Sequence, residues 1–147
     1  MRLVFPNIDY KDKAVEYIRE FQEYGSEING SRSLDRFLRE STYEAWLNKI
    51  LRDMDIANIP ASKAPALTYF YIREEDDKIV GMVNIRLALN DFLRTEGGHI
   101  GYSVRPTERR KHYATQMLTS ALKVCDVIGI KEVLISCDKK MQPLQEL

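Results

Sequence analysis

Four basic side chains and one acidic side chain lie close together in the segment that joins a predicted strand to a predicted helix. Arg105, Arg109, Arg110 and Lys111 against Glu108 give this segment a charge of 4 − 1 = +3. The N-terminus of a helix adds unpaired N–H groups and the positive end of the helix dipole. Such a junction is suited to bind an anion such as a phosphate. The alternative is a solvated basic first turn, although cations at a helix N-terminus oppose the dipole.

The helix after this segment is predicted over residues 107–128, because its apolar residues recur at helical spacing and Gly129 follows as a stop. The same spacing predicts a helix over residues 10–24 and a short one over residues 34–38. A further helix follows Ser41-Thr42-Tyr43-Glu44, which fits a capping box with Ser41 as the capping residue. These helices must position the basic segment against a sheet.

Strands are predicted where aromatic and β-branched residues replace the helical spacing. Residues 67–72 and 79–87 form a predicted hairpin, residues 97–104 a third strand, and residues 2–5 and 132–136 short strands. The consecutive strands indicate antiparallel pairing, and the final strand–helix–strand unit indicates one parallel crossover. The predicted fold class is therefore α+β, with a mixed, mostly antiparallel central sheet flanked by helices.

The composition predicts one globular domain over residues 1–147, with 44% hydrophobic and 30% charged residues. The 22 basic and 22 acidic residues give a net charge of 22 − 22 = 0, which argues against a general nucleic-acid or anionic-membrane binder. No apolar run approaches the roughly 18–20 residues that span a bilayer, and charge comes too early for a signal peptide. With two cysteines and two histidines we expect no metal site, and we expect a cytoplasmic protein.

The string Arg109-Arg110-Lys111-His112-Tyr113-Ala114, which follows Val104-Arg105-Pro106, resembles the acetyl-CoA motif of the GNAT superfamily of N-acetyltransferases. That motif is Arg/Gln-x-x-Gly-x-Gly/Ala after a strand. The pattern around it is similar to the bacterial branch of the family over residues 1–139. The resemblance implies the GNAT fold, acetyl-CoA as co-substrate, and transfer of the acetyl group to a primary amine of a small molecule or a peptide. It implies no metal.

The resemblance also assigns the cofactor contacts. The backbone of Tyr102, Ser103 and Val104 would pair with the pantetheine arm of acetyl-CoA. The amides of the following residues would hold the pyrophosphate: Arg109, Arg110, Lys111, His112, Tyr113, Ala114 and Thr115. His112 stands where the family has glycine, so its side chain either crowds a phosphate or donates to it. We expect weakened but retained binding.

Acetylation of an amine requires a base for the ammonium and an acid for the leaving thiolate. Glu96 and His99 are the candidate bases, on opposite faces of the predicted strand. The family's frequent glutamate aligns with Gly98 and is absent. His99 has a suitable ordinary pKa, and a hydrogen-bonded structural histidine is the alternative. Cys137 has no evident base partner, so we interpret it as a buried thiol rather than a nucleophile.

Relatives with this motif continue, after the last strand predicted here, with a helix and two further strands. The residues up to Leu147 leave too little chain for them, so the resemblance implies a GNAT fold without its usual last helix and strands. An open edge along Val133, Leu134 and Ile135 then predicts a homodimer that covers it. A second hypothesis is a catalytically impaired CoA-binding or interaction domain, because relatives carry the acid for the leaving thiol on that helix.

Overall fold

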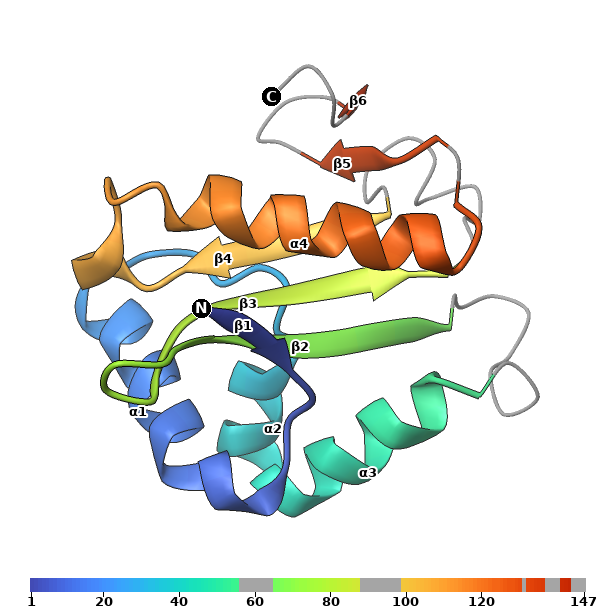
Figure 1. Ribbon diagram of the computed structural model, residues 1–147. Coiled ribbons are helices and arrows are strands. Elements are labelled where there is room, and N and C mark those ends of the chain that lie inside the picture. The colour runs from blue at the N-terminus through green and yellow to red at the C-terminus, as the bar shows by residue number, and fades with distance from the viewer. Residues whose placement is uncertain (56–64, 88–98, 131, 137–140, 144–147) are drawn as a thin grey trace.

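The computed structural model describes residues 1–55, 65–87, 99–130, 132–136 and 141–143. In this part of the chain six strands form one sheet in the order of the sequence (Figure 1). The first four pair antiparallel, β4 pairs parallel with β5, and β5 pairs antiparallel with β6. Their bounds are β1 (Arg2–Val4), β2 (Ala66–Arg73), β3 (Lys78–Arg86), β4 (Ile100–Val104), β5 (Leu134–Ser136) and β6 (Met141–Pro143). The predicted mixed, mostly antiparallel sheet is confirmed.

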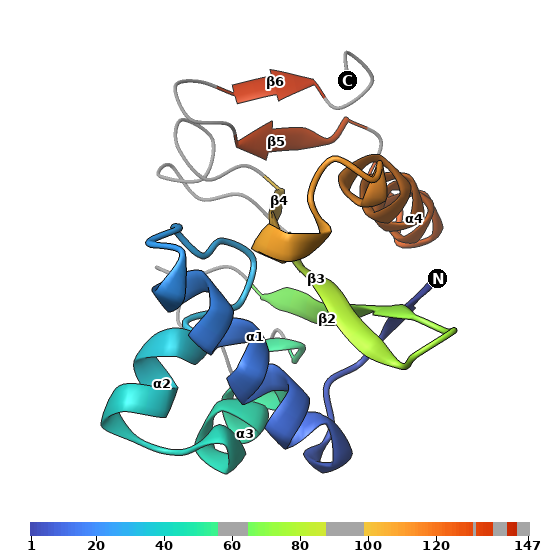
Figure 2. The same ribbon diagram turned by 90° about the vertical axis from the view of Figure 1, so that its left-hand side faces the viewer.

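Helices lie on both faces of this sheet. α1 (Lys11–Glu23), α2 (Leu34–Glu40) and α3 (Tyr43–Asp53) lie on one face, and α4 (Tyr113–Val127) lies on the other (Figure 2). The apolar stripe predicted for the first helix is buried, because residues three and four apart share one side of a helix. Its members are Ala14, Tyr17, Ile18 and Phe21. The predicted α+β layers are therefore confirmed.

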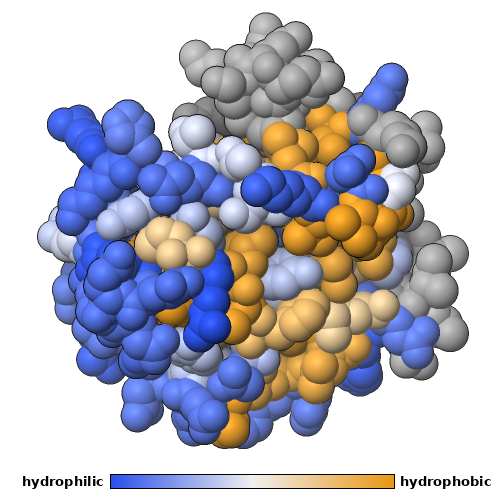
Figure 3. All heavy atoms as spheres, viewed as in Figure 1, coloured by the Kyte–Doolittle hydropathy of each residue, from blue (hydrophilic) through white to orange (hydrophobic). Residues whose placement is uncertain are grey.

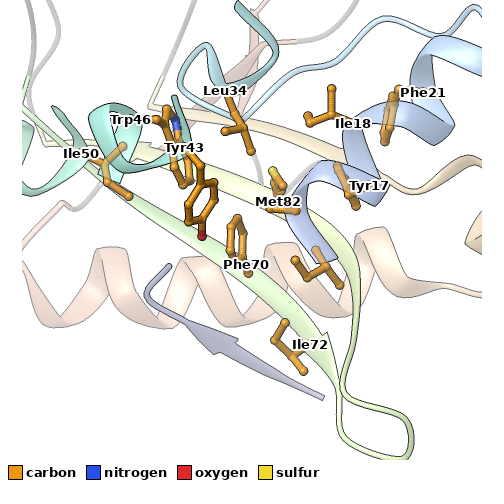
Figure 4. Packing of buried hydrophobic residues seen from close by; sticks show 12 residues of the cluster. Tyr17, Ile18, Phe21, Leu34, Tyr43, Trp46, Ile50, Phe70, Ile72 and Met82 are labelled. Atoms are coloured by element: carbon orange, nitrogen blue, oxygen red, sulfur yellow. The ribbon is translucent and has the colours of Figure 1, made fainter. Parts of the chain in front are cut away.

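Each face of the sheet has its own hydrophobic core. On one face Trp46 of α3 stacks on Phe70 of β2, with ring centroids 5.9 Å apart, and Met82 of β3 belongs to the same cluster (Figure 4). On the other face Met117 of α4 and Val83 of β3 belong to a second cluster. Met82 and Val83 are neighbours in the sequence, and a strand directs successive side chains to opposite faces. β3 therefore contributes to both cores and carries β4 beside it.

Apolar side chains also reach the surface on the α4 side of the sheet. Figure 3 shows them gathered beside α4, over strands that this helix leaves uncovered. Phe5, which is 48% exposed, stacks on Tyr69 at a centroid distance of 4.6 Å.

Within the described residues, no helix is both long enough and apolar enough to cross a membrane.

The cap of α3 differs by one residue from the prediction. The Thr42 hydroxyl accepts a hydrogen bond from the Ala45 amide at 3.0 Å, so Thr42, and not Ser41, is the capping residue. Glu44 does not reach back to the cap and instead pairs with Lys11 at 2.8 Å. Ser41 and Thr42 are both residue types that cap helices, so the sequence alone does not distinguish them. The geometry of the first turn selects Thr42.

The start of α4 also differs from the prediction. This helix begins at Tyr113 rather than at Thr107, which lies in a separate 3-10 turn over Pro106–Glu108. Positive φ angles at Arg110 (65°) and His112 (67°) separate the turn from the helix. A right-handed helix cannot pass through residues in the left-handed region. The basic residues after the turn therefore form a loop and not the first turn of the helix.

The edge of β5 is not open. β6 pairs with it in the register Leu134↔Pro143, Ile135↔Gln142 and Ser136↔Met141. The prediction of an unpaired edge along residues 133–135 was wrong, because a later part of the same chain supplies the hydrogen-bond partners. A tethered strand has a high effective concentration at such an edge. The homodimer stays a prediction, without the open edge that motivated it.

Candidate functional site

The backbone of β4 directs alternate residues to its two sides. The Arg105 amide donates to the Val80 carbonyl of β3 at 2.8 Å, so the backbone of Arg105 faces β3. Antiparallel pairing alternates along a strand, so Ser103 also directs its N–H and C=O to β3. Tyr102 and Val104 consequently direct their N–H and C=O to the β5 side.

β4 continues past its described pairing with β5. The two strands pair at Ile100 and Ile135, and β4 then runs on to Val104. The Val104 carbonyl accepts a hydrogen bond from Arg109 Nε at 3.1 Å. An extended ligand can bond to strand backbone as another strand would. The resemblance places the pantetheine arm on this side of Tyr102 and Val104, where Arg109 already bonds to the Val104 carbonyl.

The first amides of α4 form a second binding element. The first-turn hydrogen bond of this helix runs from the Gln116 amide to the His112 carbonyl, at 3.1 Å. The amides of Tyr113, Ala114 and Thr115 precede it, so they have no acceptor within the helix. They lie at the positive end of the helix dipole, which stabilises an anion such as phosphate. The anion site stays a prediction, and these amides are where we expect it although the helix begins later.

The loop before α4 has a backbone shape that favours glycine. Arg110 has φ 65°, and His112 has φ 67° and ψ 14°. Both residues are exposed, and His112 is the N-cap of α4 without a hydrogen bond from its side chain to the helix. Only glycine adopts the left-handed region without strain. The position where the resemblance expects glycine is therefore one where glycine would be the favoured residue.

Two of the basic side chains in this segment bind residues outside the segment. Arg105 is 4% exposed, and its guanidinium pairs with Glu20 at 2.9 Å and with Glu16 at 3.3 Å. Arg109 donates from Nη2 to the Ser26 hydroxyl at 2.8 Å. Carboxylates of α1 thus balance part of the charge counted along the sequence. The local charge of +3 overstated the positive field, because it omitted partners that are distant in the sequence.

Glu108 is buried at the end of the 3-10 turn and pairs with three cations. Its carboxylate lies 2.8 Å from Arg73, 3.1 Å from Lys78 and 2.8 Å from Lys111. Burial opposes ionisation of Glu108, but these hydrogen bonds outweigh it and lower the pKa of the carboxyl to about 2. The carboxylate therefore ties the loop to the β2–β3 hairpin and stays charged at neutral pH.

His99 lies next to β4 on the face of the sheet that carries α1, α2 and α3. The side chain is nearly buried, and burial together with the charge of Arg86 lowers the pKa of the imidazole, which is therefore neutral at pH 7. Arg86 lies over Gly101, where an added Cβ would be 3.2 Å from its Nη2. Burial lowers the pKa of Arg86 to about 10, with a contribution from Arg32. A neutral imidazole can accept a proton, as a general base must.

The other sequence candidates for acid–base or thiol chemistry, Glu96 and Cys137, lie outside the described residues. Neither the resemblance nor the residue spacing indicated that Glu20 contacts this segment. Gly30 packs so closely on β4 that an added Cβ would lie 2.6 Å from the Gly101 carbonyl oxygen. Gly30 and Gly101 are distant in the sequence, so no local sequence pattern indicates that they are in contact. Among the described residues, no three His, Cys, Asp or Glu side chains could hold a metal ion together.

Ser103 has a structural contact within the core. Its hydroxyl oxygen lies 2.8 Å from the hydroxyl oxygen of Tyr17 on α1. Burial raises the pKa of Tyr17 above its ordinary value, so the phenol stays protonated. The Ser103 side chain therefore anchors α1 to β4, next to the backbone groups that face the β5 side.

Comparison with known proteins places this geometry in a family. The model of the acetyltransferase (GNAT) family matches residues 31–147, which include β2 to β6 and the junction between β4 and α4. Searches of curated proteins and of solved structures gave no significant match. The strand backbone, the left-handed loop and the helix N-terminus all lie within the matched residues. The chain therefore belongs to the GNAT acetyltransferase family.

Proposed function

We propose that this protein binds acetyl-CoA and transfers its acetyl group to a primary amine of a small molecule or a peptide. The observation that carries the proposal is the junction from β4 to α4. Backbone groups of Tyr102 and Val104 on the β5 side are followed by the first-turn amides of residues 113–115. Family membership supports acetyl-CoA as the co-substrate, because the family model matches this junction.

In this proposal the pantetheine arm pairs with the β4 backbone, and the pyrophosphate lies on the amides of residues 109–115. The arm has amide groups that can bond to a strand, and the pyrophosphate is an anion that suits a helix N-terminus. The exposed Arg110 and the ammonium of Lys111, which also pairs with Glu108, add positive charge to this loop. Arg105 and Arg109 support the loop through contacts with the protein.

Bound acetyl-CoA supplies a thioester carbonyl, at which a C–N bond forms and the C–S bond breaks. The protein must take a proton from the incoming ammonium and return a proton to the leaving thiolate. His99 is the candidate proton acceptor within the described residues, because burial and Arg86 keep its imidazole neutral. Glu96 is the second candidate.

Two measurements test the proposal. Calorimetric titration with acetyl-CoA measures binding, and release of the CoA thiol in the presence of a panel of amines measures transfer. Binding together with amine-dependent thiol release is the expected result. Binding without release for any amine would favour the second hypothesis, a CoA-binding or interaction domain. A chain that binds no acetyl-CoA would overturn the proposal and would leave only the interaction domain.

The role of His99 has its own test. If His99 is the base, His99→Gln lowers kcat and removes the low-pH limb of the rate profile, while the KM for acetyl-CoA changes little. The chain has one other histidine, so His112→Gln is the matched control and should keep that limb. An unchanged pH profile in the His99 variant would assign the base elsewhere.

A further inference from the structure

A carboxylate from α1 holds the turn that leads into residues 109–115, which we call the phosphate-binding loop after the proposed function. Glu20 accepts hydrogen bonds from Arg105 Nε at 2.9 Å, from the Thr107 amide at 3.0 Å and from the Thr107 hydroxyl at 3.0 Å. The Glu20 side chain is 13% exposed. Figures 1 and 2 both show this turn, in orange, next to the C-terminal end of α1.

The contact acts as a helix cap supplied by another element. Thr107 lies in the 3-10 turn Pro106–Glu108, and Arg105, its N-cap residue, makes no capping hydrogen bond with its own side chain. The orphan amide of such a turn requires an acceptor, and a carboxylate is a strong one. Burial opposes ionisation of Glu20, but hydrogen bonds from Thr107 and Arg105 outweigh it and lower the pKa of the carboxyl.

Arg105 connects the same carboxylate to the sheet. Its Nη1 donates to the Ile79 carbonyl at 3.2 Å, and its amide donates to the Val80 carbonyl at 2.8 Å. Glu20, Arg105 and β3 therefore form one buried chain of hydrogen bonds. Movement of the Glu20 carboxylate would remove one partner of the guanidinium and the acceptor of the Thr107 amide.

The other end of the turn is fixed by Glu108, which pairs with Arg73, Lys78 and Lys111. With both ends held, the residues that follow adopt left-handed conformations at Arg110 and His112. Such conformations persist only where the surrounding structure imposes them. The direction of the loop amides thus depends on contacts that lie outside the loop.

We propose that Glu20 is a positioning residue for the phosphate-binding loop, which sets the affinity for the pyrophosphate part of CoA without contacting it. This inference rests on the proposed function, because it takes the loop to be the pyrophosphate site. A role in packing α1 alone would change stability and leave the relative affinities for parts of CoA unchanged.

The test compares Glu20→Gln with Glu16→Gln. Glu16 lies one turn earlier on α1 and also pairs with Arg105, at 3.3 Å, but its side chain is 67% exposed. We expect Glu20→Gln to raise the Kd for CoA about tenfold, which corresponds to about 1.4 kcal/mol. Glu16→Gln should change it less than about twofold, as removal of an exposed ion pair usually does. Calorimetric titration with CoA measures both.

Pantetheine, which lacks the pyrophosphate, is the control ligand, and its weaker binding is followed by ligand-observed NMR. Its affinity should be the same in the wild type and in Glu20→Gln. Thr107→Val is a milder variant that removes only the hydroxyl donor, and it should weaken CoA binding in the same direction if Glu20→Gln folds poorly. Thermal unfolding without ligand shows which variants are folded.

The outcomes separate this inference from the proposed function. Wild-type protein that binds CoA, with both the Glu20 and the Thr107 variants binding it equally well, overturns the positioning role alone. Equal weakening of CoA and pantetheine in Glu20→Gln also overturns it, because the effect would then not be confined to the phosphate site. Wild-type protein that binds no CoA overturns the proposed function and this inference with it.

Discussion

Substitution of His112 by glycine tests both the strain in the loop and its role in binding. His112 has φ 67° and ψ 14°, is exposed, and makes no capping hydrogen bond. The left-handed conformation costs a residue with a Cβ about 1–2 kcal/mol. Glycine avoids that cost but loses about 0.5–1 kcal/mol more in backbone entropy on folding. The difference predicts that His112→Gly raises the free energy of unfolding by about 0.5–1 kcal/mol.

For a domain of this size that gain raises Tm by about 1–4 °C. His112→Ala is the matched control, because alanine removes the imidazole and keeps the Cβ that causes the strain. We expect the alanine variant to show no increase in Tm. Differential scanning calorimetry of the three proteins without ligand separates the backbone effect from the effect of the ring.

The same variants report on CoA binding. With glycine, the loop backbone can approach a phosphate closely, so we expect His112→Gly to tighten CoA binding by about three- to tenfold, or up to about 1.4 kcal/mol. Calorimetric titration measures the Kd. If both the glycine and the alanine variants bind CoA more weakly, the imidazole is a phosphate ligand and the steric reasoning is wrong. If His112→Gly lowers Tm, the left-handed conformation is not a source of strain.

Three further predictions concern stability. Gly30 has φ 76°, and an added Cβ would lie 2.6 Å from a backbone oxygen, so Gly30→Ala should lower the free energy of unfolding by about 2–4 kcal/mol in urea titrations. Gly25 has φ 60° but no atom near its added Cβ, so Gly25→Ala should cost only about 1–2 kcal/mol. Glu108 has a depressed folded-state pKa of about 2, so its contribution is complete above its ordinary pKa of 4.5 and is lost as the pH falls toward 2. Glu108→Gln should therefore cost about 3 kcal/mol at pH 7 and nearly nothing at pH 2, and a constant difference in urea titrations would contradict this. Thr42→Ala should cost about 1 kcal/mol and Ser41→Ala nearly nothing, and the reverse order would restore Ser41 as the cap of α3.

The elements whose hydrophobic pattern is regular could be predicted from the sequence. The stripe Ala14, Tyr17, Ile18 and Phe21 is buried as the helical period requires. The alternation along β3 places Met82 in one core and Val83 in the other. Burial of one face imposes these periods, so they remain visible without knowledge of the partner element.

Helix starts were less predictable, because they depend on single residues. The sequence prediction began this helix at Thr107, a residue type that favours the cap position. In the structure the Thr107 hydroxyl bonds to Glu20 instead, and α4 begins after His112 without a side-chain cap. A tertiary contact thus replaced the local signal. The absence of glycine from the left-handed positions concealed the loop that separates the turn from the helix.

The local charge count was an incomplete description of the segment that we propose as the phosphate site. Arg105 contributed to the local +3, yet its carboxylate partners on α1 are 85 and 89 residues away in the sequence. No window along the chain includes such pairs. In our proposal the segment still binds an anion, because backbone amides and the helix dipole attract one without any net charge on the side chains. That is consistent with a protein whose 22 basic and 22 acidic residues cancel.

The same pairs explain how carboxylates can lie so near the phosphate site that we propose. A free carboxylate beside the loop would repel a pyrophosphate, but Glu20 and Glu108 are each saturated by hydrogen bonds from guanidinium, ammonium or amide groups. The charge of these two carboxylates is neutralised by their partners. Their effect on the loop is therefore to fix the conformation of its backbone. Arg105, Arg109 and Lys111 thus help to hold the loop in shape through their contacts with the protein. The amides that they orient are the groups that, in our proposal, bind the cofactor.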